Sequence, residues 1–283
     1  MNDGADLLVR PFLRLSMGVI NIIFILTIAV LYLLVQGYRR RLKPFTSLWY
    51  AGICVAIGGG LLALAVLPNT TFYGPVLYQA PTQEKVVALT FDDGPYPPYT
   101  AQVLKVLADK QVQATFFVVG ENARALPHLV QEEQQAGHLI GIHSYEHKDM
   151  FRLSSGEIAA QLREAKAVVA SITGEEPRYF RPPHGFHDWR VMGAAREANL
   201  TVVNWSALGK DWTNPGVDTI VNNVMSRVGP GSIILLHDGD SPHKVSKREQ
   251  TVAALPILID RLRSEGYSFV TVDHMLSYVG ERK

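Results

Sequence analysis

The chain has 283 residues, of which 47% are hydrophobic, so it can form one large domain or two small ones with a substantial core. Its formal net charge is +1, from 27 basic and 26 acidic side chains, which argues against a nucleic-acid partner and against a disordered acidic tail. The single cysteine, Cys54, excludes a disulfide framework and a cysteine-based metal site. Any metal must therefore be held by histidine and carboxylate side chains.

Two long apolar runs lie near the N-terminus, at about residues 17–36 and 48–67. Each is close to the roughly 20 residues that cross a bilayer as a helix. The loop between them carries three arginines and a lysine at positions 39–43, and such loops face the cytoplasm under the positive-inside rule. We therefore predict that 1–68 is a multi-pass anchor in the cell membrane with lipid as its partner, and that everything after it is extracytoplasmic.

A cleaved signal peptide is the alternative interpretation of the first run. Against it, the charged region before the run is long and a second apolar run follows. Residues 69–84 are rich in turn-forming and polar residues, and we expect them to tether the anchor to a soluble domain over 85–283.

Within this soluble domain, short apolar runs alternate with amphipathic stretches. The apolar runs are 86–91, 114–119, 138–143, 179–181, 201–206, 232–237 and 267–272. Helical patterns lie at 102–110, after a capping box at Ser154, at 217–228 and at 251–263. Repeated strand–helix–strand order predicts an α/β fold with about seven parallel strands, buried on both faces. The pattern alone fits either a barrel or a doubly wound open sheet.

Polar residues gather at the C-terminal ends of these runs. The clusters are Asp92-Asp93, HSYEH (143–147), RPPHG (181–185), Asp211-Trp212 and LLHD (235–238). In an α/β barrel the C-terminal ends of the strands converge on one face, where such enzymes carry out their chemistry. The sequence therefore predicts one site built from all five clusters.

Asp92 and Asp93 stand side by side at the end of the first run. Adjacent residues on an extended backbone point to opposite sides, so we expect one carboxylate to hold a metal and the other to handle a proton. The alternative is that Asp92 and Asp93, together with the Gly and Pro that follow them, form only a turn, because Asp, Gly and Pro all favour turns. The other clusters must distinguish these interpretations.

His143 and His147 are four residues apart, a spacing that brings both imidazoles to one side of a helical turn. Alone, such a pair is a weak signal, since surface and core histidines often share this spacing. Joined by Asp93, it forms a three-ligand set with an open position, as catalytic zinc requires. Non-haem iron uses the same ligand types, so the set does not by itself identify the metal.

Hydrolysis at a carbonyl needs a base, an acid and stabilisation of the oxyanion. Asp92 is the candidate base, with Arg181 to pair with it and keep it ionised. His237 is the candidate acid, and Asp211 would favour its protonated form. The prolines before His184 have no N–H, so its backbone N–H is the candidate oxyanion donor. The alternatives are a structural salt bridge for Arg181 and a hydrogen-bonded strand-end histidine for His237.

In chain order, the five clusters resemble the five motifs of the NodB-homology polysaccharide deacetylases, carbohydrate esterase family four. The resemblance covers about residues 84–276 and leaves the hairpin outside. It implies a deformed (β/α) barrel, here behind a two-helix transmembrane hairpin. It also implies a metal-dependent hydrolase that removes acetyl groups from N-acetylated sugars of a cell-envelope or extracellular polysaccharide. The implied cofactor is a divalent metal, zinc first, with cobalt, manganese or nickel as alternatives.

The resemblance also implies a role for each matching residue. Asp92 would be the base, positioned by Arg181, and His237 would be the acid, oriented by Asp211. Asp93, His143 and His147 would be the metal ligands. Trp212 and Leu235 would line the acetyl pocket. The chain departs from the family at His184, where an aromatic residue, commonly tyrosine, is usual. Five other histidines, His187 among them, lie outside the motifs and are expected to be structural or solvent-facing.

Two rival functions are less consistent with these residues. A membrane-tethered glycan-binding protein could keep the site for recognition without activity. A glycosidase could use Asp92 and Asp93 as acid and base, but such carboxylates flank the scissile bond roughly 5 to 9.5 Å apart, and neighbours that face opposite ways do not obviously do so.

Overall fold

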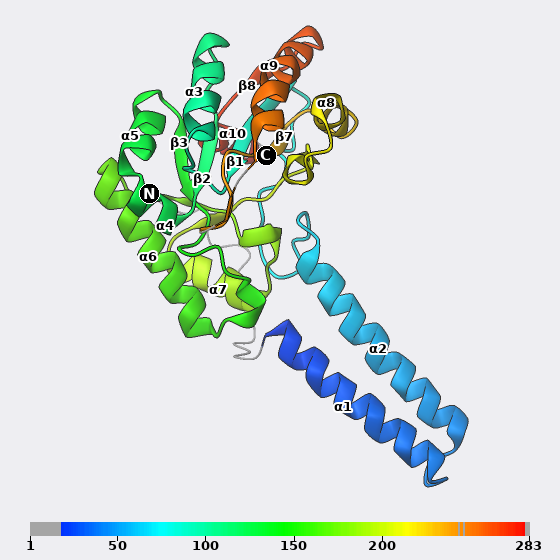
Figure 1. Ribbon diagram of the computed structural model, residues 1–283. Helices are drawn as coiled ribbons and strands as arrows, with labels where there is room; N and C mark the ends of the chain where they lie inside the picture. Colours follow the sequence, from blue (N-terminus) through cyan, green and yellow to red (C-terminus); the bar gives the residue numbers. More distant parts are fainter. Residues whose placement is uncertain (1–17, 243, 246, 281–283) are drawn as a thin grey trace.

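A computed structural model describes residues 18–280 except 243 and 246, so the predicted start of the first span at 17 and one histidine outside the motifs, His243, lie outside the described residues. A helical hairpin of α1 (Val19–Tyr38) and α2 (Pro44–Val66) projects from an α/β domain (Figure 1). Both helices end near the predicted bounds. The second begins four residues earlier than expected, since Pro44 suits the first position of a helix.

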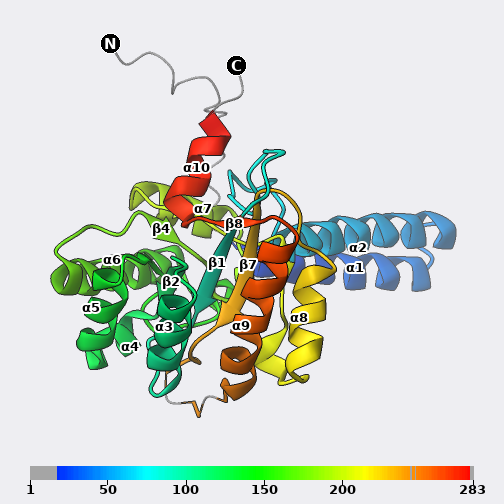
Figure 2. The same ribbon diagram turned by 90° about the horizontal axis from the view of Figure 1, so that it is seen from above.

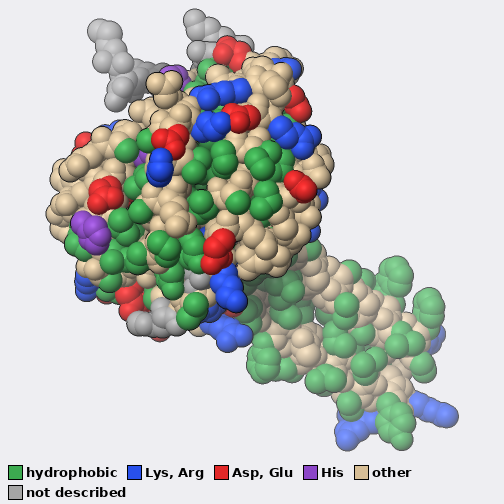
Figure 3. Space-filling view, turned by 45° about the horizontal axis from the view of Figure 1, so that its top comes forward, with side chains coloured by type: hydrophobic (Ala, Val, Ile, Leu, Met, Phe, Trp, Pro, Cys, Tyr) green, Lys and Arg blue, Asp and Glu red, His purple; other side chains and the backbone are tan. Residues whose placement is uncertain are grey.

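The hairpin exposes its apolar side chains. Its two helices are long and apolar enough to cross a membrane. Figure 3 shows hydrophobic side chains along the projecting hairpin and basic side chains at its far end. The hairpin therefore has the composition of a membrane anchor.

In the described part of the chain, the domain is built from eight strands and the helices that connect them. The strands are β1 (Val86–Asp92), β2 (Thr115–Val118), β3 (Leu139–Ile142), β4 (Tyr179–Phe180), β5 (Thr201–Val202), β6 (Ala207–Leu208), β7 (Ser232–His237) and β8 (Ser268–Phe269). The α-helices are α3 (Tyr99–Asp109), α4 (Gly120–Ala125), α5 (Pro127–Gln135), α6 (Ser155–Thr173), α7 (Trp189–Glu197), α8 (Val217–Met225), α9 (Glu249–Ser264) and α10 (Val272–Gly280). Three 3-10 turns are η1 (Met150–Arg152), η2 (Pro183–Gly185) and η3 (Asp211–Thr213).

All strand pairs are parallel, in the order β5-β4-β3-β2-β1-β7-β6, with β8 beside the start of β1. The sheet curls into a half-barrel, and α3, α5, α6, α8 and α9 lie around its outside (Figure 2). The prediction of about seven parallel strands in a deformed barrel is confirmed, and the doubly wound sheet is excluded.

The predicted strand at 201–206 is divided between the two edges of the sheet. Thr201–Val202 forms β5 at one edge, and Ala207–Leu208 forms β6 at the other. The residues between them cross the gap: the N–H of Asn204 donates to the Leu77 carbonyl, and that of Ser206 to the Ile233 carbonyl. The break therefore lets one segment supply an edge strand on each side of the sheet.

Alternation along β1 separates two cores. Val87, Leu89 and Phe91 pack outward against the helices, whereas Val86 and Ala88 belong to a second core inside the barrel. Side chains on a strand alternate between its faces, so Thr90 and Asp92 continue the inward row. The strand therefore delivers Asp92 to the barrel interior at its C-terminal rim.

The opposite end of the barrel is closed by the segment that we expected to be a tether. Leu77 and Ala80 are buried in the inner core together with Val272 and Met275 of α10. Leu77 is also bridged to the β5 side of the sheet at Val203. Much of the segment 69–84 thus packs against the domain, because its apolar residues cover the barrel's lower end.

Candidate active site and metal centre

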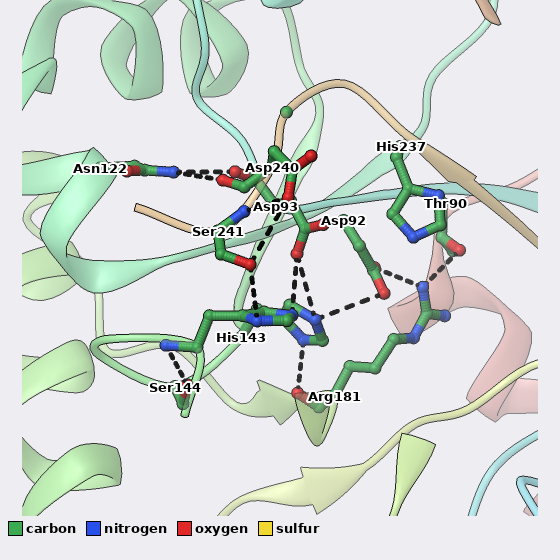
Figure 4. Close-up of polar contacts among 12 residues, drawn as sticks. Thr90, Asp92, Asp93, Asn122, His143, Ser144, Arg181, His237, Asp240 and Ser241 are labelled. Atoms are coloured by element: carbon green, nitrogen blue, oxygen red, sulfur yellow. Dashed lines mark hydrogen bonds and ion pairs between the residues drawn. The ribbon is translucent and has the colours of Figure 1, made fainter. Parts of the chain in front are cut away.

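Residues of four of the five polar clusters lie together at one rim of the barrel in Figure 4, and Asp211 of the remaining cluster is hydrogen-bonded to His237 there. Asp92 and His237 are register partners on the neighbouring strands β1 and β7. His143 follows β3 and hydrogen-bonds through its N–H to the Val118 carbonyl at the end of β2. Parallel strands thus bring residues far apart in sequence to one edge.

Asp92 and Arg181 form a buried ion pair inside the barrel. Arg181 Nη1 lies 2.7 Å from Asp92 Oδ1 and 2.8 Å from the Thr90 hydroxyl, and Arg181 is fully buried. The other guanidinium nitrogens donate to the carbonyls of Val203 and Asn204. Because each guanidinium nitrogen has a partner, Arg181 is held in place and in turn fixes Asp92 Oδ1. The other carboxylate oxygen, Oδ2, points toward His143 Nε2 at 3.7 Å.

Asp93 leaves the strand geometry and turns toward the histidines. Its φ of +74° lies in the left-handed region, which non-glycine residues rarely adopt and which often marks a functional site. A Cβ at Gly239 would come within 2.4 Å of the Asp93 carbonyl oxygen, so the β7 loop can approach only because residue 239 is glycine. Asp92 therefore pairs with Arg181 inside the barrel, whereas Asp93 turns toward His147.

The two histidines do not lie on a helical turn, so that expectation was wrong. Residues 143–149 form a bend, in which Ser144 and His147 have positive φ values of +63° and +55°. The N–H of His147 donates to the Ser144 hydroxyl, and the Gln161 side chain accepts from the N–H groups of Tyr145 and Glu146. These bonds replace helical ones and still bring the two rings within 5.0 Å of each other.

The three expected ligands fit a divalent cation. The ligand atoms of Asp93, His143 and His147 lie within 4.8 Å of one another. Asp93 Oδ1 is buried without a hydrogen-bond partner, although His147 Nε2 lies 3.1 Å away. His143 Nδ1 is 2.7 Å from the Arg181 carbonyl, which must accept its proton and leaves Nε2 free for a ligand bond. An orphaned carboxylate oxygen between two imidazole nitrogens is the arrangement that a metal would satisfy.

The protonation states suit this role. Burial lowers the pKa of His143 to about 4, so its imidazole is neutral at pH 7. For Asp93, burial favours the protonated form, but the surrounding histidines, His147 foremost, hold its pKa well below the usual range. A neutral imidazole and an ionised carboxylate are the forms that bind metal.

His237 lies across the site from this cluster and is held by Asp211. Its Nδ1 is 2.9 Å from Asp211 Oδ1, and its backbone N–H donates to Asp211 Oδ2 at 2.8 Å. Burial alone would lower the pKa of His237, but the Asp211 charge and hydrogen bond raise it to about 9. Trp212 packs edge-on against the His237 ring at 5.2 Å and is 43% exposed. His237 is therefore protonated at pH 7 and partly exposed at the rim.

The last two predicted residues differ in placement. His184 is exposed, has a φ of +61°, and turns its ring edge-on to His147 at 5.1 Å. Leu235 is buried two residues before His237 on β7, hence on the same inward face. The structure thus brings all ten predicted site residues to one region, with His184 and Trp212 at its surface.

A family model for polysaccharide deacetylases matches residues 79–203. A peptidoglycan-N-acetylglucosamine deacetylase from Bacillus cereus is 40% identical over 207 residues, which span 72% of this chain and 94% of the relative. The chain belongs to the polysaccharide deacetylase family. A chitooligosaccharide deacetylase from Sinorhizobium fredii is 40% identical over 187 residues, which cover 64% of the chain and 87% of that relative. The family expected from the five clusters is therefore confirmed.

Solved structures give the deacetylase the same fold. A crystal structure of a peptidoglycan N-acetylglucosamine deacetylase, bound to an N-hydroxy benzamide, has a TM-score of 0.66 and 34% identity over 71% of this chain and 92% of that one. A pseudoenzyme of carbohydrate esterase family four from Bacillus anthracis has the same TM-score with 28% identity, over 71% of this chain and 69% of that one. Family membership therefore fixes the fold, while activity must be argued from the site.

Two residues of the deacetylase site escaped the sequence analysis. The Ser241 hydroxyl lies 3.1 Å from His147 Nδ1, and Asn122 Nδ2 donates to the carbonyls of Asp93 and Asp240. Asn122 follows the second apolar run, so the strand-end rule that found the other clusters could have found it. Ser241 had no signal beyond its position in the loop after the fifth cluster.

We expect Ser241→Ala to weaken metal binding by roughly tenfold, because hydrogen bonds to the outer nitrogen of a metal-binding histidine orient the ring. Calorimetric titration of the metal-free deacetylase with Zn²⁺ measures the effect. Ser241→Thr keeps the hydroxyl and is the matched control. Equal affinities for the wild type and the alanine variant would show that Ser241 does not orient His147.

Proposed function

We propose that this protein is a metal-dependent deacetylase that removes acetyl groups from N-acetylated sugars of a cell-envelope polysaccharide. The observation that carries the proposal is the division of the carboxylate pair. Asp92 is tied to Arg181, Asp93 faces His143 and His147, and the proton-bearing His237 lies at the end of the neighbouring strand. This arrangement provides the base, ligand set and acid that amide hydrolysis requires.

Asp93, His143 and His147 would hold the divalent metal, zinc first, with cobalt, manganese and nickel as alternatives. When bound there, the metal supplies a Lewis acid for the acetyl carbonyl and lowers the pKa of its water. A three-ligand set leaves room for both water and substrate. The choice of metal belongs to this proposal, because histidine and carboxylate suit several divalent ions.

The remaining residues perform the proton transfers. Asp92 Oδ2 takes a proton from the attacking water, while Arg181 holds Oδ1 and keeps the carboxylate in place. The new carbon–oxygen bond gives the acetyl oxygen a negative charge, which the His184 N–H stabilises. His237 donates its proton to the sugar nitrogen as the carbon–nitrogen bond breaks, and acetate leaves. Trp212 and Leu235 line the space for the acetyl methyl group.

The relatives support the proposed substrate class. They are named for peptidoglycan N-acetylglucosamine and for chitooligosaccharides, whose common unit is an N-acetylated glucosamine. We assign a polymer of this unit to the present chain. The hairpin, with apolar sides and a basic tip, supports an anchor in the cell membrane with the catalytic domain on the extracytoplasmic side.

An acetate-release screen tests the proposal. Full-length protein in detergent is incubated with peptidoglycan, chitooligosaccharides and acetylxylan, with chelator and after adding back each metal. We expect acetate from the glucosamine polymers only, loss with chelator and recovery with Zn²⁺. Glycan binding without acetate would favour the binding-only alternative. New reducing ends would instead indicate a glycosidase.

The pH profile tests the role of Asp211. His237 keeps its proton below a pKa of about 9 and loses it as the pH rises through that value, so activity should fall on the alkaline side. Asp211→Asn removes the charge that raises this pKa, and the loss should move to lower pH. We expect acetate release at pH 8 to fall on the order of tenfold while the acidic limb stays in place. An unchanged alkaline limb would exclude His237 as the acid.

A further inference from the structure

Both domain-facing ends of the hairpin are hydrogen-bonded to one dipeptide of the catalytic domain, His187-Asp188. The N–H of Val19, the first residue of α1, lies 3.4 Å from Asp188 Oδ2. The N–H of His187 donates at 3.0 Å to the carbonyl of Ala65, in the last turn of α2. A helix start has unpaired N–H groups and a helix end has unpaired carbonyls, and a negative charge suits the start. The dipeptide therefore caps both domain-facing ends of the hairpin with the correct polarity.

This contact is closed to solvent. Val19, Ala65, His187 and Asp188 are all 0% exposed, and both hairpin residues belong to the outer core of the barrel. The Tyr73 hydroxyl also donates to the Leu61 carbonyl of α2 at 2.6 Å. A buried polar group without a hydrogen-bond partner is costly in free energy. Breaking any of these bonds should therefore destabilise both the hairpin ends and the segment of the domain that contacts them.

The dipeptide directly follows the loop that carries His184. His184 and Gly185 are consecutive residues in the left-handed region, with φ values of +61° and +72°. A conformation of this kind persists when its surroundings hold it. The His187 ring lies between the carbonyls of Gly185 and Thr70, at 2.9 and 3.2 Å. Part of what holds the loop thus comes from the chain just after α2.

A second connection reaches the candidate base. Asn204 Nδ2 donates to the carbonyl of Pro68, at the end of the hairpin, and to that of Gly185. The carbonyl of the same Asn204 accepts from Arg181 Nη2 at 3.1 Å, and Arg181 Nη1 holds Asp92. Hydrogen bonds therefore run without interruption from the hairpin to the site.

We propose that the hairpin is a positioning element of the catalytic site as well as an anchor. Its capped ends hold residues 181–188, and with them the His184 N–H and the Arg181 guanidinium, in the active arrangement. The expected effect on acetate release rests on the proposed function, whereas the expected effect on amide hydrogen exchange does not. If the hairpin were joined by a flexible tether, a change in the hairpin would not alter the conformation or activity of the catalytic domain. The observed contact predicts that such a change alters both.

The test uses Val19→Pro in the full chain in lipid nanodiscs. Proline is favoured at the first position of a helix, and Gly18 is already extended as a residue before proline requires, so α1 should form and lose only the N–H that Asp188 accepts. Val19→Ala is the matched control, because it removes most of the side chain but keeps the N–H. Amide hydrogen exchange over 183–190 and the kcat and KM of acetate release are measured for both.

We expect Val19→Pro to speed exchange over 183–190 about tenfold relative to Val19→Ala and to lower kcat several-fold, with little change in KM. Should Val19→Pro not fold, Tyr73→Phe removes the hydroxyl that donates to the Leu61 carbonyl of α2 and should shift exchange in the same direction. Equal exchange in Val19→Pro and Val19→Ala would overturn the proposal, as would wild-type exchange in Tyr73→Phe. A wild type that releases no acetate but shows the exchange difference would refute the proposed function and leave this contact supported.

Discussion

Asp92→Asn should lower acetate release by on the order of 10³-fold while the protein still binds one metal ion, because the variant loses the base but no ligand. The asparagine oxygen can still accept from Arg181 Nη1, which lies 2.7 Å from Asp92 Oδ1, so the buried arginine keeps a partner. Acetate release and metal content are measured on the same purified sample. The prediction separates proton transfer from metal binding.

Asp93→Asn is the matched variant at the neighbouring position. It replaces the carboxylate oxygen that lies 3.1 Å from His147 Nε2 and 3.5 Å from His143 Nε2. A neutral amide is a poor ligand for zinc, so we expect metal affinity to fall by more than about 100-fold and activity to return only at high metal concentration. Metal loss in Asp92→Asn, or full metal binding in Asp93→Asn, would reverse the two assignments.

Arg181→Met should strongly destabilise the domain. Arg181 is fully buried, and its guanidinium pairs with Asp92 and bonds Thr90, Val203 and Asn204. Removing it leaves a buried carboxylate without its cation, which costs about 3–5 kcal/mol of the free energy of unfolding. Urea denaturation in detergent, followed by tryptophan fluorescence, measures the loss.

Two controls show whether the charge pair is the cause. Arg181→Lys keeps a cation but not the planar fork that reaches four partners, so it should restore only part of the stability. Adding Asp92→Asn to Arg181→Met removes the unpaired charge, and the double variant should be more stable than Arg181→Met alone. A double variant that loses the sum of the two single effects would show that Arg181 acts through packing, for instance against Phe117, 4.2 Å from its guanidinium.

Much of the fold was predictable because it follows from local patterns. Alternating apolar runs and amphipathic stretches gave the parallel strands, and the Ser154–Glu157 capping box marked the true start of α6. The prediction failed where tertiary contacts override the pattern. The run at 201–206 reads as one strand, yet it divides because its middle must cross from one sheet edge to the other.

The candidate site divides in the same way. The strand-end rule found the residues of the five clusters, since parallel strands place their C-terminal ends together whatever the loops do. It misjudged the conformation of His143 and His147, because the Ser144 hydroxyl and the Gln161 side chain supply hydrogen bonds that a helix would otherwise have made. It also missed Ser241, which reaches His147 from a loop that lies about a hundred residues away in sequence.

The sequence by itself determined the family, the parallel α/β fold, the apolar hairpin and the residue types at the rim, since each depends on order and spacing along the chain. Only the tertiary structure decided how the two adjacent carboxylates differ: Asp92 continues the inward row of β1 to Arg181, while the left-handed backbone at Asp93 turns its side chain to the histidines. It also decided that the hairpin joins the site through His187 and Asp188. The hairpin contact between Val19 and Asp188 spans 169 positions and the pair of Asp92 and Arg181 spans 89, and no local pattern encodes such pairings.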